Sequence, residues 1–78
     1  MSIMGKIVRR VIDGYVTLIE WSPSDPATVE AAEMIFRREV KGGYMAVVED
    51  DGVHSREPVR SLTVDAERVV MTMPMGGG

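Results

Sequence analysis

The sequence predicts a small α+β domain in which one amphipathic helix packs on one face of a small mixed β-sheet, with the element order ββαβββ. Three observations support this prediction. Two β-prone runs flank Asp13-Gly14, apolar residues at helical spacing follow a proline-containing break, and shorter β-prone runs follow Gly42-Gly43. Strands that precede and follow a single helix favour a sheet with the helix on one face.

Length and composition indicate one small domain with a thin core. A chain of 78 residues buries only about 60% of its unfolded surface, or slightly more. The sequence contains no cysteine, so neither a disulfide nor a thiolate metal site reinforces the fold. Stability must therefore come from apolar packing, with help from a partner where one binds.

Charge and hydropathy argue against nucleic-acid and membrane binding. The net charge is −3, and the arginines are interspersed with acids. A nucleic-acid binder normally has a basic face and stacking aromatics, whereas this chain has only four aromatic residues. No apolar run reaches the length of a membrane span, and the N-terminal residues lack the apolar core of a signal peptide. We therefore expect a cytoplasmic protein.

The first element that the sequence predicts is a β-hairpin. Two runs rich in β-branched and aromatic side chains, residues 7–12 and 15–21, flank Asp13-Gly14. Asp-Gly tolerates the positive φ values that a two-residue hairpin loop requires. The predicted cross-strand neighbours are Ile12 with Tyr15 and Val11 with Val16, and Val8 and Ile19 share the face of the first pair.

A helix is predicted over Pro26–Lys41. Asp25 can cap the free N-terminal amides, and Pro26 suits the first helical position, where its missing N–H costs nothing. Gly42-Gly43 is a typical C-terminal stop. The stripe expected to face the sheet contains Val29, Ala32, Phe36 and Val40, with Ile35 beside it, whereas Glu30, Glu33, Arg37, Arg38 and Glu39 are expected on the other side.

Three further β-segments are predicted after the helix. Residues 44–48 form a strand by composition, Glu49-Asp50-Asp51-Gly52 a turn, and residues 54–60 a polar segment that Pro58 restricts to an edge or an irregular path. A short strand is predicted over Val59, Leu62 and Val64, then a turn over residues 65–67 and a last strand over residues 69–73. This order of elements is that of the β-grasp fold. We divide the chain into one domain, residues 1–73, and a glycine-rich tail, residues 74–78.

The tail carries the strongest functional signal. A β-prone run is followed by Met73-Pro74-Met75-Gly76-Gly77-Gly78. Glycine has no Cβ, so its backbone passes through sites that are too narrow for other residues. This ending resembles those of ubiquitin-like sulfur carriers, such as the small subunit of molybdopterin synthase and the thiamine sulfur carrier, in which a terminal Gly-Gly follows a strand and often a proline.

The resemblance implies a function for the terminal carboxylate. In that family an adenylyltransferase activates the carboxylate as an acyl-adenylate, which is then converted to a thiocarboxylate or joined to an amine. Gly77 and Gly78 would carry this chemistry, and the residues expected to contact the partner are Met73, Pro74, Met75 and Gly76. Three glycines depart from the family's Gly-Gly, so the reactive residue would be Gly78, or Gly77 after trimming.

No other group of residues predicts catalysis, and we expect neither an enzyme nor a cofactor. His54, the single histidine, has no cysteine or second histidine with which to form a zinc site, and no defined acid for a catalytic triad. Glu49-Asp50-Asp51 lacks the alternating ligands of a calcium loop, which favours a solvated turn. Of the seven methionines, Met34 and Met45 are expected in the core, and Met73 and Met75 at a contact surface.

A second function class fits the same sequence. The chain would be a small structural subunit of a larger assembly, such as the head, neck or tail of a bacteriophage virion, and its strand edges and termini would dock on neighbouring subunits. The tail would then be a packing element, or a frayed end without a function of its own. A carrier needs a free carboxylate, whereas a structural subunit tolerates a C-terminal tag in solution but assembles poorly with it. We favour the carrier.

Overall fold

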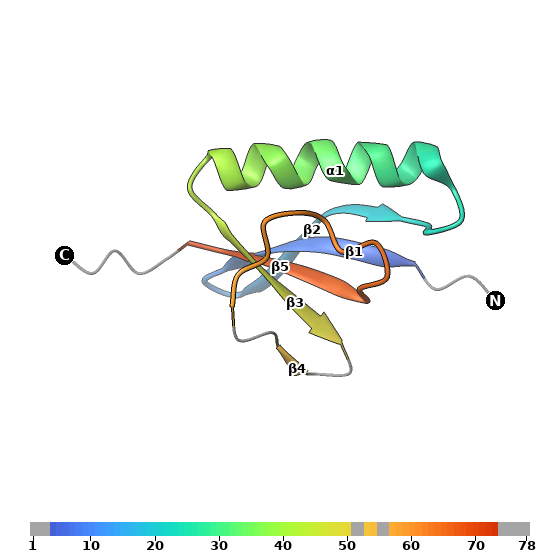
Figure 1. Cartoon of the computed structure of the whole chain (residues 1–78). Helices are drawn as coiled ribbons and strands as arrows, with labels where there is room; N and C mark the ends of the chain where they lie inside the picture. Colours follow the sequence, from blue (N-terminus) through green and yellow to red (C-terminus); the bar gives the residue numbers. More distant parts are fainter. Residues whose placement is uncertain (1–3, 51–52, 55–56, 74–78) are drawn as a thin grey trace.

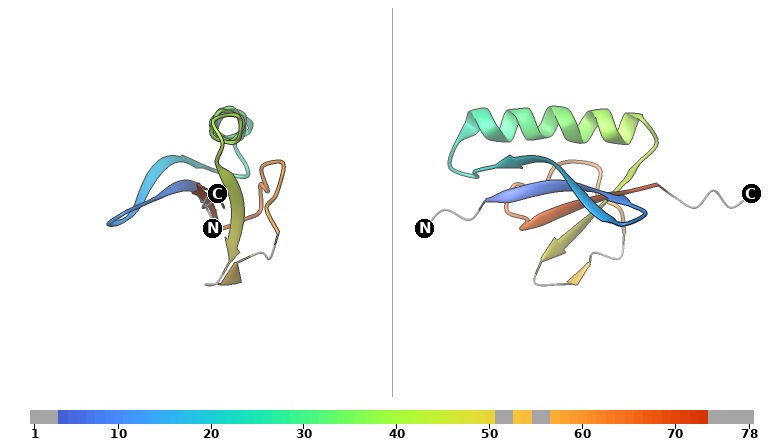
Figure 2. Two further views of the ribbon diagram at one scale, coloured as in Figure 1. Left: turned by 90° about the vertical axis from the view of Figure 1, so that its left-hand side faces the viewer. Right: turned by 180° about the vertical axis from the view of Figure 1, so that it is seen from behind.

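The structure is a computed structural model, and it describes residues 4–50, 53–54 and 57–73. The described elements are β1 (Gly5–Val11), β2 (Gly14–Trp21), α1 (Pro26–Lys41), β3 (Met45–Asp50), β4 (Val53–His54) and β5 (Arg68–Thr72). The strands form one sheet in the order β2-β1-β5-β3-β4, and α1 lies across one of its faces (Figures 1 and 2). The predicted α+β class and the order ββαβββ are confirmed.

The last strand lies in the middle of the sheet. β5 pairs in parallel with β1 on one side and antiparallel with β3 on the other. The β1–β2 hairpin and the β3–β4 hairpin therefore form the two sides of a mixed sheet that β5 joins. The first and last strands thus form a parallel pair in the middle of the sheet, and one helix crosses over it. This is the β-grasp-like arrangement that the element order predicts.

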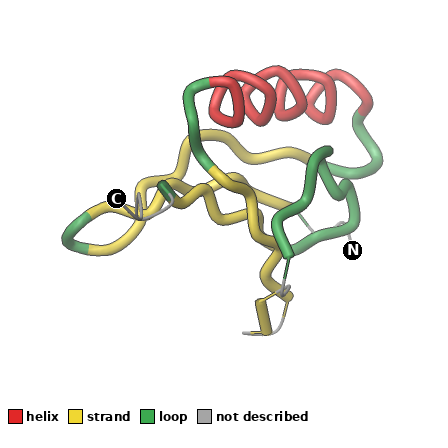
Figure 3. The backbone as a smooth tube through the Cα atoms, turned by 60° about the vertical axis from the view of Figure 1, so that its left-hand side comes forward, coloured by secondary structure: helices red, strands yellow, loops and turns green. Residues whose placement is uncertain are grey.

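The β1–β2 hairpin forms, but the predicted register is wrong. Its turn consists of Ile12 and Asp13, so Val11 lies opposite Gly14, and Tyr15 lies opposite Arg10 instead of Ile12. Gly14 has φ 135°, a value that favours glycine, and it takes this conformation as the first residue of β2. Figure 3 shows this turn projecting away from α1 and from the other loops.

A β-bulge then changes the register within the hairpin. Val8 lies opposite Thr17, whereas its neighbour Ile7 lies opposite Ile19, so Leu18 is the extra residue on β2. Because side chains alternate between the faces of a strand, Ile7 and Ile19 share the face that α1 covers and Val8 points to the other face. The predicted common face for Val8 and Ile19 is therefore wrong.

The packing of Trp21 explains why this register is favoured. Trp21 is fully buried and lies opposite Gly5. A Cβ at Gly5 would lie 2.3 Å from Cζ2 of the indole and 2.8 Å from the carbonyl oxygen of Ala66, so a larger residue does not fit there. The predicted register would have placed Trp21 opposite Lys6. The indole Nε1 also donates a hydrogen bond of 3.0 Å to the carbonyl of Val64, which fixes the loop before β5.

The helix has the predicted boundaries, Pro26–Lys41. The Asp25 side chain accepts a hydrogen bond of 3.1 Å from the backbone N–H of Ala27, as an N-cap residue should. At the other end the N–H of Gly42 reaches the carbonyls of the last turn, and Gly43 has φ 104°. Two consecutive glycines therefore end the helix and turn the chain back toward the sheet.

The inward stripe of α1 differs from the predicted one at its last position. Ala32 and Phe36 are buried as predicted, and Val29 and Ile35 pack against the core. The next inward residue is Glu39, which is 7% exposed, whereas Val40 is 41% exposed. The stripe thus follows the spacing of residues 29, 32, 36 and 39, and a carboxylate takes the place that we predicted for an apolar side chain.

The segment between β3 and β5 is a loop packed on the core, and the predicted short strand over Val59, Leu62 and Val64 is wrong. Val59 forms one isolated bridge with Ala46, with an N–H to carbonyl distance of 2.8 Å. Leu62 and Val64 pack against the core without joining the sheet. The short strand is instead β4, which pairs antiparallel with the end of β3 and occupies part of its edge.

We predict that Gly5→Ala strongly destabilises the domain, because its new methyl group would overlap the buried Trp21 ring. Overpacking of this kind costs about 1–3 kcal/mol, and occasionally more. Thermal unfolding followed by tryptophan fluorescence measures the change. Gly42→Ala is the matched control, because a Cβ there lies 3.4 Å from its nearest neighbours. Equal melting temperatures for the two variants would show that Gly5 is not needed for the packing of Trp21.

Candidate functional site

The candidate site lies at the end of β5, where the chain leaves the sheet. Met73, the first of the predicted contact residues, directly follows β5 and is 52% exposed. The other predicted residues, Pro74, Met75, Gly76, Gly77 and Gly78, lie outside the described residues. The described part of the site is therefore the point at which the tail begins.

The strand that precedes Met73 is the best-buried strand of the sheet. Val69, Val70 and Met71 are at most 5% exposed, although consecutive residues point to opposite faces. β1 and β3 pair with β5 on its two sides, so main-chain hydrogen bonds hold both edges. β5, which precedes the tail in the sequence, therefore has a fixed position relative to the rest of the domain.

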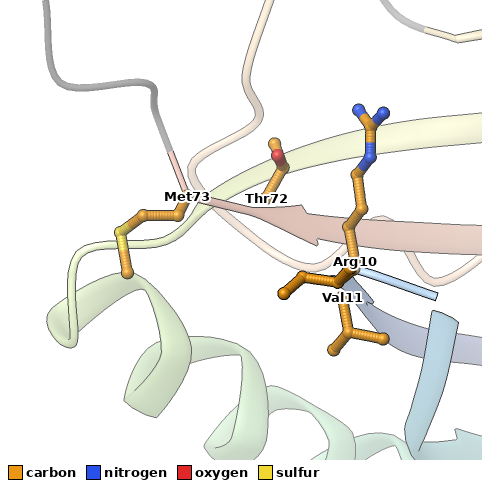
Figure 4. Close-up of a pocket in the computed structure, with 5 residues that line it drawn as sticks. Arg10, Val11, Thr72 and Met73 are labelled. Carbon is orange, nitrogen blue, oxygen red and sulfur yellow. The ribbon is translucent and has the colours of Figure 1, made fainter. Parts of the chain in front are cut away.

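A groove lies next to Met73, between the end of β5 and the hairpin turn. Its volume is about 560 Å³, and it is lined by Arg10, Val11, Ile12, Thr72 and Met73. Figure 4 shows Arg10 and Thr72 on one side of the ribbon, with Val11 and Met73 on the other. Ile12 is fully exposed. The groove thus combines apolar side chains with one arginine.

An ion pair between the buried Glu39 and the partly exposed Arg9 connects α1 to β1 beside this groove. The Arg9 guanidinium donates hydrogen bonds of 2.9 and 2.7 Å to the two carboxylate oxygens of Glu39, and it lies 4.9 Å from the centre of the Tyr44 ring. This bidentate geometry satisfies the carboxylate that α1 turns toward the sheet. It also ties the C-terminal part of the helix to the strand that pairs with β5.

The same pair raises the pKa of Arg9 above its ordinary value, because its side chain is hydrogen-bonded to the Glu39 carboxylate. A basic group whose pKa is higher in the folded protein than in the unfolded chain stabilises the fold, and this stabilisation is complete at pH values below the unfolded-state pKa. The stabilisation is lost as the pH rises through the folded-state pKa. Both values lie in the strongly alkaline range. Titration of Arg9 therefore does not make the stability depend on pH near neutrality.

The face of the sheet opposite α1 carries a second cation. The Arg68 guanidinium lies 5.0 Å from the centre of the Tyr15 ring and forms an ion pair with Glu49. Val8 and Val70, which point to this face, are 2% and 5% exposed although no helix covers them (Figure 2). The long side chains of Arg68 and Tyr15 lie over this face and shield its apolar centre.

The remaining candidate residues do not line the groove, although Met45 lies opposite Thr72 in the register of β3 and β5. Met34 and Met45 are 66% and 36% exposed, so the prediction that both are core residues is wrong, and Met71 is the buried methionine of the strands. His54 lies opposite Glu49 in the register of β3 and β4. Within the described ranges no cluster of histidine, cysteine or carboxylate side chains has the makings of a metal site.

Sequence reasoning missed the groove and the Arg9–Glu39 pair. The helical spacing of residues 29, 32 and 36 points to 39 as well as to 40, so Glu39 on the inward stripe was a detectable signal for a buried partner. The groove had a weaker signal, the exposed apolar residue Ile12 beside the Asp13-Gly14 turn.

Comparison of this chain with protein-family models, with curated proteins and with solved structures finds no match. In the part of the chain that the structure describes, no helix has the length and apolar character that crossing a membrane requires.

We predict that Glu39→Gln lowers the melting temperature by about 5 °C, because the bidentate pair is lost while the partly exposed Arg9 stays solvated, at a cost of about 1 kcal/mol. Glutamine keeps the shape of the side chain, so the change reports on the charge and on the second hydrogen bond. Glu30→Gln is the control, since Glu30 is exposed on the same helix. If both variants melt at the same temperature, the pair does not contribute to stability.

Proposed function

We propose that this protein is a non-enzymatic, ubiquitin-like carrier that acts through the carboxylate of its C-terminal glycines, Gly77 and Gly78. One observation carries the proposal. In the sequence the tail follows the central strand of the sheet, and ladders on both sides hold that strand in place. A glycine-rich segment on a rigid base suits delivery of a carboxylate into a narrow site on another protein.

The partner in this proposal is an activating adenylyltransferase. It would form an acyl-adenylate at the terminal carboxylate, and a sulfur donor or an amine would then displace the adenylate. Met73, Pro74, Met75 and Gly76 would contact this enzyme on the approach to its active site. The carrier would need no cofactor of its own and would work in the cytoplasm, without nucleic acid or membrane.

A structural subunit of a larger assembly, such as a bacteriophage virion, is the second candidate function. The exposed apolar side chains of the β1–β2 hairpin favour it, because Ile12, Tyr15 and Val16 are 102%, 48% and 49% exposed. β2 is also an edge strand of the sheet, and an edge offers unpaired backbone groups to a neighbouring chain. In such an assembly the glycines would pack against neighbouring subunits.

We predict that the protein purified from its native source, without a C-terminal tag, is modified at its last glycine. Intact mass spectrometry would then find a thiocarboxylate, which differs by replacement of one oxygen atom by sulfur, or an isopeptide bond to another protein. The modification is expected at Gly78, or at Gly77 after trimming. An unmodified chain recovered in fixed proportion with a particle or larger complex would overturn the carrier and support the structural subunit.

A variant that ends at Gly76, expressed in the same source, is the control for this measurement. It should lack the modification and keep the melting temperature of the full chain, because the last strand ends at Thr72. A modification that persists in this variant would lie elsewhere in the chain and would count against the proposed role of Gly77 and Gly78.

A further inference from the structure

The turn of the β1–β2 hairpin presents an apolar side chain and a carboxylate side by side. Ile12 is 102% exposed, so no part of the described chain packs on it, and Asp13 next to it is also exposed. Two-residue hairpin turns favour Asn, Asp and Gly, and isoleucine has no conformational advantage in one. An isoleucine at this position therefore points to a contact with another molecule.

The groove beside this turn has the complementary chemistry. Val11 and Met73 provide apolar surface, and Arg10 stands on the opposite side of the ribbon (Figure 4). Among the described residues neither Arg10 nor Asp13 takes part in an ion pair. The groove thus suits an apolar side chain that has a carboxylate next to it, and Ile12-Asp13 of a second copy has this combination.

We propose that two copies of this chain associate about a twofold axis through their hairpin turns. Each Ile12 enters the groove of the other copy, and each Asp13 lies opposite the Arg10 of that copy. A twofold axis brings the same surface of both copies into contact, so the contact between the Ile12-Asp13 turn of one copy and the groove of the other forms twice. The projection of the turn from the body of the domain (Figures 2 and 3) leaves it accessible to a second copy.

The size of the groove sets the strength of this association. A stable interface buries about 800 Å² on each partner, and five lining residues provide considerably less. The dimer is therefore weak and depends on protein concentration. Edge pairing of β2 with another chain is restricted to the stretches on either side of the bulge at Leu18, so the hairpin turn is the better route to a dimer. The proposal does not depend on the carrier function.

Charge reversal tests the predicted contact. Sedimentation velocity of the full chain, from micromolar to millimolar concentration, gives the dissociation constant of the dimer. Arg10→Asp or Asp13→Arg alone places like charges opposite each other twice, and either change should weaken the dimer by about tenfold or more. The double variant exchanges the two charges and should restore the dimer to within about threefold of the original constant.

Two variants that each replace an exposed apolar residue by serine, one at the contact and one away from it, test the apolar part of the interface. Ile12→Ser should abolish the dimer, whereas Met34→Ser should leave it unchanged, because Met34 is 66% exposed on α1 and lies outside the groove. All of these residues are exposed, so circular dichroism should show the same fold for every variant. A chain that stays monomeric at millimolar concentration overturns the proposal. A dimer that is insensitive to Ile12→Ser, or one that the double variant does not restore, overturns it as well.

Discussion

The position of β5 in the middle of the sheet is the constraint on which the rest of the structure depends. Residues 68–72 supply one side of the parallel ladder with β1 and one side of the antiparallel ladder with β3. Without this strand the two hairpins have no common sheet, and the face beneath α1 loses Val69 and Met71, two of its fully buried side chains. The fold is therefore complete only when the last strand of the chain is in place, which makes the long-range pairing of β1 with β5 its decisive contact.

Two long-range contacts hold the remaining elements on this central strand. The indole of Trp21 fills the space over Gly5 and binds the carbonyl of Val64, so the edge strand β2 fixes the loop that leads into β5. The Arg9–Glu39 pair does the same for the helix, since it joins residues 30 positions apart. The first contact joins β2 to the loop before β5 and the second joins α1 to β1, so each holds together elements that are distant in the sequence.

The sequence was sufficient where local chemistry determines the structure. Asp25-Pro26 and Gly42-Gly43 set both helix ends, and β-prone composition located β1, β2, β3 and β5 to within two residues of their ends but missed β4. It was insufficient where a residue distant in the sequence determines the structure. The hairpin register depends on the space that Gly5 leaves for Trp21. Glu39 faces inward because Arg9 of β1 binds it there. Leu62 and Val64 have strand-like composition, but their side chains pack against the core from a loop that does not join the sheet. The groove depends on the β1–β5 register, which no local pattern predicts.

The end of β5 links the carrier function to the self-association of the chain. Met73 is both the first residue after the central strand and part of the groove that would receive Ile12 of a second copy. A partner that covers Met73 while it handles the tail would then compete with self-association, because both use the same surface. By thermodynamic linkage, such a partner would bind the monomer more tightly than the dimer, and a high concentration of the chain would weaken its binding. The apolar hairpin turn would thus limit access to the glycine tail through mass action alone, without any change in the fold.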